Sequence, residues 1–258
     1  MTVGSRITFE KLCHEELSRE KERDGIGLYA EKRLHSVLKR WMYDDFAAHE
    51  QKVPERGGKI SRFVADILTP SGEIIEIQTG EMFRLARKVV FYMSKTDLRV
   101  TLVHPLAVQK QINWLDPETG EVRERNRSPK KESVLEGLAQ LKALARFLGD
   151  PRLTVVFPML ELEEFRLLDG WVKNPKRRSH RYELIPTALL DTEVLCEKQT
   201  YLSLFPQDLP ERFTAKIFGK HTRLRGYALY DAIAVFEALG AIRRLGKEGR
   251  SFVFERVI

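Results

Sequence analysis

Cysteine is scarce in this sequence, and long hydrophobic runs are absent. The chain has 258 residues and two cysteines, Cys13 and Cys196, which stand far apart and outside any CxxC or Cys/His cluster. This pattern excludes a disulfide scaffold, gives no sign of structural zinc, and predicts two reduced thiols. The longest apolar run, residues 229–242, is shorter than the roughly 20 residues of a membrane span and contains Asp231 and Glu237. We therefore expect a cytoplasmic protein without a membrane partner.

Several common enzyme motifs are also missing. The sequence contains no GxxxxGK[ST], GxGxxG, HExxH or GxSxG pattern, so it gives no support to the nucleotide, zinc or serine chemistry that these motifs carry. Residues 1–10 lack the apolar core of a signal peptide.

The charge balance is moderately basic. There are 44 Lys and Arg residues against 37 Asp and Glu residues, which gives a formal net charge of +7, and 43% of the residues are hydrophobic. This is the composition of an ordinary globular chain of one or two domains. The basic excess favours an anionic partner.

Hydrophobic periodicity predicts alternating helices and strands. We expect helices over 7–23, 26–41, 81–93 and 132–148, strands over 59–68, 73–78, 98–103 and 153–157, a hairpin near 116–120, basic loops over 123–131 and 171–181, and a helical bridge over 182–204. This order predicts an α/β or α+β fold with a mixed sheet. It divides the chain into a first domain, 1–204 with a helical extension, and a second domain, 205–258.

The C-terminal domain has a compact pattern of its own. A short helix over 214–218, a turn, a helix over 225–239 and a strand–turn–strand segment over 241–254 resemble a winged-helix DNA-binding domain. Residues 205–258 hold ten basic and six acidic side chains. The resemblance implies that the second helix and the hairpin contact nucleic acid through Arg223, Arg225, Tyr227, Arg243, Arg244, Lys247 and Arg250. Winged helices also serve as protein-interaction modules and dimer interfaces, so a homodimer stays open.

The most specific local feature is a set of polar residues in two apolar strands. Asp66 lies in the first strand, and Glu76 and Gln78 lie on one face of the second. Pro70 and Gly72 favour a three-residue hairpin loop, and this loop places Asp66 directly opposite Glu76. Two carboxylates directly opposite each other on neighbouring strands repel each other unless a divalent cation lies between them.

This pattern resembles the PD-(D/E)XK nuclease superfamily. In that family a helix with a glutamate precedes a hairpin that carries Asp on one strand and (D/E)-x-K on the next. Here the helix contributes Tyr29-Ala30-Glu31-Lys32, and the hairpin contributes Asp66 and Glu76-Ile77-Gln78. The resemblance covers about residues 24–105 and implies a restriction-endonuclease-like core.

The resemblance also implies a chemistry. Asp66 and Glu76, with the Ile77 carbonyl, would hold Mg²⁺ or Mn²⁺, and Glu31 would complete the site, which His35 could join. The expected activity is phosphodiester hydrolysis, with DNA as the expected substrate. Gln78 replaces the usual lysine, and Lys32, Lys39 and Arg84 are the candidates for a substitute cation.

Other interpretations stay open. Asp66 and Glu76 could form ion pairs with Arg62 or Arg84, and Glu31 could be a solvent-exposed helix carboxylate. The chain could then be a non-catalytic DNA-binding protein or regulator that retains a degenerate nuclease fold, or an interaction module in a larger nucleic-acid-processing complex.

Overall fold

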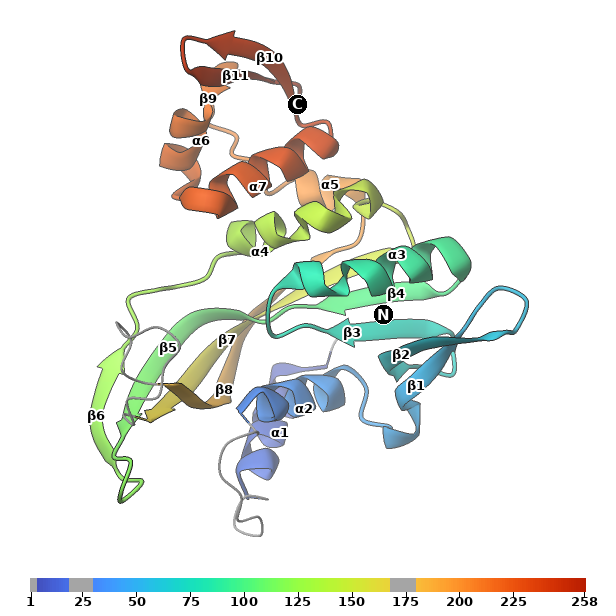
Figure 1. Ribbon diagram of the computed structural model, residues 1–258, viewed down its shortest axis with the longest axis vertical. Helices are drawn as coiled ribbons and strands as arrows, with labels where there is room; N and C mark the ends of the chain where they lie inside the picture. Colours follow the sequence, from blue (N-terminus) through green and yellow to red (C-terminus); the bar gives the residue numbers. More distant parts are fainter. Residues whose placement is uncertain (1–3, 19–29, 168–179) are drawn as a thin grey trace. The chain divides into compact units, whose positions relative to one another are not determined.

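The computed structural model describes residues 4–18, 30–167 and 180–258 (Figure 1). The helices in these ranges are α1 (Arg6–Ser18), α2 (Ala30–Met42), α3 (Ala86–Lys95), α4 (Val134–Gln140), α5 (Lys198–Leu202), α6 (Ala215–Thr222) and α7 (Gly226–Ala238), with short 3-10 helices η2 (Phe46–Ala48), η3 (Met82–Leu85) and η4 (Leu141–Phe147). The strands are β1 (His49–Pro54), β2 (Ile60–Leu68), β3 (Glu73–Ile77), β4 (Arg99–Val103), β5 (Leu106–Leu115), β6 (Val122–Arg127), β7 (Leu153–Leu167), β8 (His180–Leu195), β9 (Arg212–Thr214), β10 (Ile242–Glu248) and β11 (Ser251–Arg256).

The strands form two sheets, and the fold is the mixed α/β arrangement that the sequence predicted. The eight-stranded sheet runs β1-β2-β3-β4-β7-β5-β6, and β8 pairs with β7. The three-stranded sheet runs β10-β11-β9. The chain divides into two compact units: residues 1–49, 105–132 and 158–192 form the first, and residues 50–104, 133–157 and 193–258 form the second.

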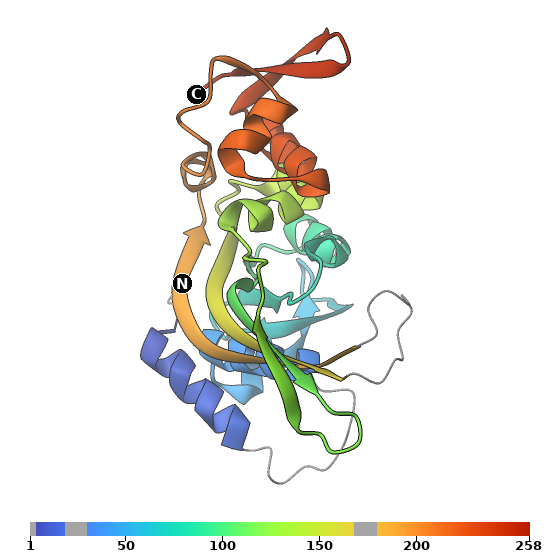
Figure 2. The same cartoon turned by 90° about the vertical axis from the view of Figure 1, so that its left-hand side faces the viewer.

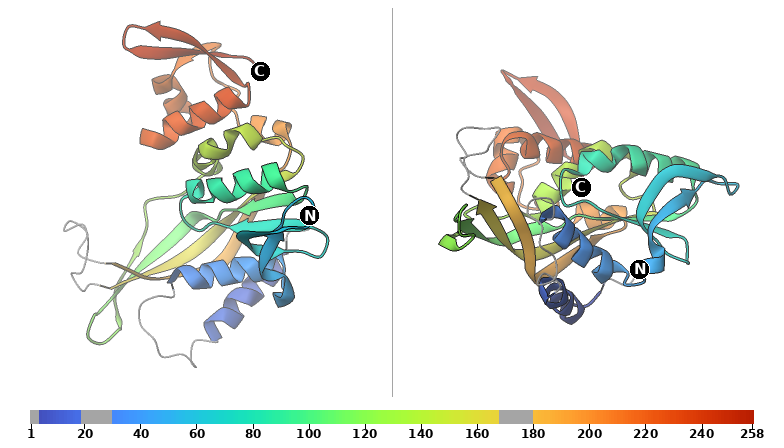
Figure 3. Two further views of the ribbon diagram at one scale, coloured as in Figure 1. Left: turned by 45° about the vertical axis from the view of Figure 1, so that its right-hand side comes forward. Right: turned by 60° about the horizontal axis from the view of Figure 1, so that its bottom comes forward.

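The centre of the second unit is a parallel strand core. Strand β3 pairs in parallel with β4, and β4 pairs in parallel with the start of β7. These strands are almost continuously buried, and most of their residues are apolar, as expected of parallel strands covered on both faces. Helix α3 packs beside β4, and α3, α4 and α7 succeed one another away from β3 and β4 (Figure 3).

The first unit combines two helices with a hairpin. Helices α1 and α2 pack together, and the rings of Phe9 and Trp41 meet edge to face with centroids 5.6 Å apart. Strands β5 and β6 form the hairpin expected near residues 116–120. Asp116 Oδ1 holds its loop by accepting hydrogen bonds from the backbone N–H groups of Glu118 and Thr119.

The C-terminal segment of the second unit has its own aromatic core. Four phenylalanines are buried here: Phe213 of β9, Phe218 of α6, Phe236 of α7 and Phe254 of β11. The ring of Phe213 contacts those of Phe218 and Phe254, and the ring of Phe218 also contacts that of Phe236. Helix α7 ends where predicted, because Gly240 adopts φ +75° just after it. The β10–β11 hairpin extends beyond α6 and α7 (Figure 2).

The helical bridge predicted over 182–204 is wrong. Residues 180–195 form strand β8, and only Lys198–Leu202 are helical in α5. The Leu-rich sequence favours a helix locally, but pairing with β7 overrides that preference. Pro186 fits this outcome, since proline breaks a helix interior but is tolerated in a strand with an unpaired edge.

Smaller differences have similar causes. The loop expected at 123–131 begins with strand β6, which pairs with β5, and strand β1 lies in a segment for which no helix or strand was predicted. The helix expected over 132–148 is α-helical only to Gln140 and continues as a 3-10 helix. The expected basic loop over 171–181 and the segment 19–29 fall largely or wholly outside the described residues. No helix in the described part of the chain is long and apolar enough to cross a membrane.

Candidate active site

The hairpin of β2 and β3 has the predicted loop and register. Leu68 pairs with Ile74 and Ile67 with Ile75. The N–H of Gly72 donates to the carbonyl of Thr69 at 3.0 Å, and the N–H of Thr69 donates to the carbonyl of Glu73 at 2.9 Å. Gly72 has φ +79°, the left-handed conformation expected for the last loop residue. The same register, carried one position further, places Asp66 across from Glu76.

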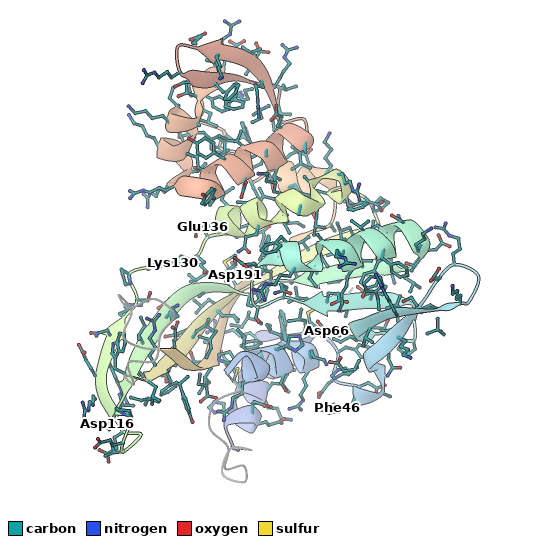
Figure 4. All side chains as sticks on the ribbon, in the orientation of Figure 1. Phe46, Asp66, Asp116, Lys130, Glu136 and Asp191 are labelled. Atoms are coloured by element: carbon teal, nitrogen blue, oxygen red, sulfur yellow. The ribbon has the colours of Figure 1, made fainter. Side chains whose placement is uncertain are left out.

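Asp66 lies where the β2–β3 ladder stops (labelled in Figure 4). Its Oδ2 accepts a hydrogen bond from the backbone N–H of Ile77 at 2.7 Å. The Asp66 carboxylate therefore accepts a hydrogen bond from the backbone of the residue that follows Glu76. This bond fixes the Asp66 side chain against β3 and brings a second negative charge close to Glu76.

Glu76 is buried, with 1% of its surface exposed, and α3 supplies its partners. Lys88 Nζ donates to Glu76 Oε1 at 3.0 Å and to Oε2 at 2.9 Å, and it also donates to the carbonyl of Val64 at 2.8 Å. The hydroxyl of Tyr92 donates to Glu76 Oε1 at 2.6 Å. The Lys88 side chain as a whole remains 29% exposed.

The helical period explains why these two partners meet one carboxylate. Lys88 and Tyr92 are spaced i, i+4, so they share a face of α3. The same face carries the buried side chains of Leu85, Val89 and Met93. Lys88 therefore occupies a position in the apolar stripe where a hydrophobic residue is the norm. The sequence analysis missed Lys88 and Tyr92, and a lysine inside such a stripe was the signal that could have found them.

The surroundings of Glu76 shift its proton equilibrium. Burial and the nearby charge of Asp66 raise the pKa of Glu76 from its ordinary value near 4.5 to about 7, although Lys88 and the Tyr92 hydroxyl oppose the shift. Burial and the Glu76 charge also raise the pKa of Tyr92, so its hydroxyl stays protonated as a donor. A carboxyl that titrates near neutral pH beside a second carboxylate is typical of functional sites.

Gln78 lies just after β3 and is fixed through its backbone. Its N–H donates to the carbonyl of Val103 at 2.9 Å. Its carbonyl accepts from His104 Nδ1 at 2.7 Å, and His104 Nε2 lies 3.0 Å from the amide nitrogen of Gln140. Because a carbonyl can only accept, His104 is protonated on Nδ1, and its Nε2 accepts from Gln140. This partly buried chain of hydrogen bonds holds the backbone that follows Glu76.

The other residues that the sequence predicted for this site lie in several places. Glu31 lies in α2, but its side chain and that of Lys32 are outside the described part of the structure. Lys39 and His35 belong to the first unit, also on α2. Arg84 pairs with Glu81 at 3.6 Å, and Arg62 lies over the ring of Phe63. The ion-pair partner of Glu76 is thus Lys88, and neither Arg62 nor Arg84.

The hairpin offers two carboxylates, those of Asp66 and Glu76, as possible ligands of a divalent cation. Within residues 4–18, 30–167 and 180–258, no group of three or more His, Cys, Asp or Glu side chains has the arrangement of a metal site. Asp66 and Glu76 nevertheless supply two neighbouring carboxylates, which suit Mg²⁺, an ion commonly held by one or two carboxylates together with waters and substrate phosphates. A divalent cation at this site would therefore have two ligands from the protein, the carboxylates of Asp66 and Glu76.

The basic residues predicted for the C-terminal segment are on its surface. Arg223 caps α6 with φ +61°, Arg225 caps α7, and Tyr227 in the first turn of α7 is 90% exposed. On the β10–β11 hairpin, Arg243 pairs with Glu255, and Arg244 pairs with Glu237 at 2.9 Å.

The hairpin also combines cations with an exposed aromatic ring. Arg244 and Lys247 both lie over the ring of Phe252, at 4.8 and 4.9 Å from its centroid. Phe252 is 42% exposed, and Arg250 is exposed near the turn. Because exposed ion pairs contribute at most about 1 kcal/mol, the Arg243 and Arg244 pairs add little to the stability of the hairpin.

The fold and the hairpin site define a mixed α/β protein with a buried, lysine-paired carboxylate. A sequence profile described as a domain of unknown function, DUF8091, matches residues 32–196, which is more than half of the chain. The chain belongs to this family. The matched range contains Asp66, Glu76 and Lys88 and ends before the C-terminal segment. No curated protein and no solved structure matches the chain.

Proposed function

We propose that this protein is a metal-dependent nuclease that hydrolyses phosphodiester bonds, with DNA as the expected substrate. The observation that carries the proposal is the grouping of Asp66, Glu76 and Lys88, two carboxylates and a cation at the end of one hairpin. The usual lysine of the resembled motif is absent at Gln78, and Lys88 supplies an ammonium group beside the same glutamate. We propose that the protein acts in the cytoplasm, where Cys13 and Cys196 stay reduced.

The chemistry divides between the cation and the side chains. A divalent cation held by Asp66 and Glu76 would neutralise charge on the phosphate and lower the pKa of a water molecule. The Ile77 N–H keeps Asp66 in place, and Tyr92 keeps Glu76 in place. Lys88 offers positive charge to the phosphate as negative charge develops there, and preorganised charge of this kind is a large part of enzymatic rate enhancement.

Binding of the substrate is assigned to the C-terminal segment, which we propose to be a winged helix. The order β9, α6, α7, β10, β11 agrees with that topology. The exposed cations Arg223, Arg225, Lys247 and Arg250 supply the charge that a phosphate backbone requires. Contacts of this kind hold nucleic acid without reading its sequence.

A second candidate is a non-catalytic nucleic-acid-binding protein. The observation in its favour is the ion pair of Glu76 with Lys88, which balances the buried carboxylate without any metal. In this case the hairpin site would serve stability alone, and the C-terminal segment would carry the whole function.

Cleavage assays separate the two candidates. Single-stranded, duplex and branched DNA would be incubated with Mg²⁺ or Mn²⁺ and with wild type, Asp66→Asn, Glu76→Gln, Lys88→Met or Lys88→Arg. The nuclease proposal expects loss of cleavage in the first two variants, a fall of about 100-fold or more in Lys88→Met, and partial recovery in Lys88→Arg. Glu73→Gln is the matched control, since Glu73 is a buried carboxyl on the same strand that bonds Thr101 instead. Binding without cleavage in wild type would support the second candidate.

A further inference from the structure

Two tyrosines form an exposed aromatic surface at the start of α7. Tyr227 is 90% exposed and Tyr230 is 60% exposed. Their i, i+3 spacing makes them neighbours on the helix surface. Single exposed apolar side chains are common, but neighbouring ones that form a patch often mark a binding site. We call Tyr227 and Tyr230 together the tyrosine pair.

The remainder of α7 is covered within the second unit. The helix packs against α4 and η4 on one side and against α6 and β10 on another. Ala232, Ile233, Val235 and Phe236 are buried. Asp231 is tied to Lys142 of η4 at 2.6 Å. The exposed part of α7 is thus little more than its first turn, where the tyrosine pair lies.

The segment that leads into the tyrosine pair is cationic. Lys216, Lys220, Arg223 and Arg225 are exposed, and no Asp or Glu occurs between Arg212 and Tyr230. Asp208 lies against this stretch, where it pairs with His221 at 2.8 Å. Four cations beside two open aromatic rings are complementary to a strand that has phosphates along its backbone and base faces available for stacking.

We propose that the tyrosine pair and its four cations bind an unpaired nucleic-acid strand. Bases would stack on Tyr227 and Tyr230, and phosphates would contact Arg223, Arg225 and the two lysines. In a duplex the base faces are hidden in the helical stack, whereas a single strand exposes them to aromatic side chains. This inference rests on the proposed action on nucleic acid, and it narrows the substrate to single strands or duplexes with an unpaired segment.

Fluorescence anisotropy of the full chain tests the proposal. The probes are a labelled 20-nucleotide strand of mixed sequence and the blunt duplex of the same sequence, both in a chelator so that no cleavage occurs. Wild type should bind the single strand at least about tenfold more tightly than the duplex. Tyr227→Ala/Tyr230→Ala should weaken single-strand binding at least about tenfold, because each stacked base contributes roughly 1–3 kcal/mol. Tyr227→Phe/Tyr230→Phe keeps both rings and should bind within about threefold of wild type.

The salt dependence gives a second readout. Arg223→Ala/Arg225→Ala should reduce the slope of log affinity against log salt concentration by about 1.4, since each phosphate contact on a single strand contributes about 0.7. Equal or tighter binding of the duplex would overturn the proposal, as would unchanged single-strand binding in the double alanine variant. Self-association in light scattering that the same variant abolishes would also overturn it and assign the surface to a second copy of this chain.

The outcome of the binding assays does not depend on whether the protein cleaves DNA. Glu73→Gln, the control that leaves the proposed machinery intact, should bind the single strand as wild type does. Absence of cleavage by wild type, together with single-strand binding that depends on the tyrosine pair, would contradict the nuclease proposal alone. Intact catalysis without any effect of the tyrosine pair would contradict only this inference.

Discussion

The raised pKa of Glu76 predicts a specific dependence of stability on pH. Its folded-state pKa of about 7 lies above the ordinary value of 4.5, so between these values the folded state binds a proton that the unfolded state has released. Stability must then fall as pH rises through this window. For one group with these two pKa values, the loss between pH 5 and pH 8 amounts to about 2.5 kcal/mol.

The perturbation that isolates this contribution is Glu76→Gln. The amide keeps an acceptor for the Tyr92 hydroxyl but cannot ionise. The free energy of unfolding would be measured by urea denaturation at pH 5, 6, 7 and 8 for wild type and variant. The wild-type value minus the variant value should decrease by about 2.5 kcal/mol across this range, with most of the change below pH 7. Other titrating groups cancel in this difference when they are unaffected by the substitution.

Glu73→Gln serves as the matched control, because it removes a buried carboxyl from the same strand. Glu76 is intact in this variant, so the slope assigned to Glu76 cancels from its difference with wild type. A Glu76→Gln difference that stays constant within about 0.5 kcal/mol, the range of neutral surface substitutions, would refute the reasoning. It would mean that the Lys88 ion pair fully offsets the burial of the carboxylate and the repulsion from Asp66.

The same contacts give further predictions. Lys88→Met should destabilise the protein by about 1–3 kcal/mol at pH 8, where Glu76 is ionised, and by less at pH 5, as measured by urea denaturation at both values. Tyr92→Phe should cost about 1–2 kcal/mol and shift the stability loss to higher pH, because the hydroxyl lowers the pKa of Glu76. If the site holds a cation, Mg²⁺ should raise the melting temperature of wild type at pH 8 and leave Asp66→Asn unchanged. Gly72→Ala should destabilise the hairpin by about 1 kcal/mol, because φ +79° is strained for alanine and its Cβ would lie 3.3 Å from Leu98.

Local signals were sufficient to predict the hairpin that carries the candidate site. The Pro70-Ser71-Gly72 loop fixes its own geometry through backbone preferences, and a loop of fixed length sets the register of the strands that it joins. The position of Asp66 directly across from Glu76 follows from these few residues. The end of α7 at Gly240 was predictable for the same reason, because the left-handed conformation strongly favours glycine.

Long-range pairing limits what could be predicted. Strand β8 is stabilised by β7, a partner that local helix propensity cannot reveal. The contact of Lys88 with Glu76 has the same origin, since it depends on how α3 packs over β3. Sequence reasoning sought a substitute for the missing lysine on α2 and at Arg84, whereas the structure supplies a cation one helical turn beyond Arg84.

The position of that lysine bears on how the site could work. A lysine at position 78 would follow Glu76 on the same strand, and its location would be set by the strand alone. Lys88 instead joins α3 to β2 and β3, because it bonds the Val64 carbonyl and both oxygens of Glu76. A cation that binds Glu76 would compete with this ammonium group and release it toward the phosphate. The cation requirement and the Lys88 requirement of cleavage should therefore be coupled: Lys88→Met should bind Mn²⁺ at least as tightly as wild type, in isothermal titration at pH 8, while losing activity. Weaker Mn²⁺ binding in this variant would contradict the competition and leave Lys88 as a structural partner of Glu76.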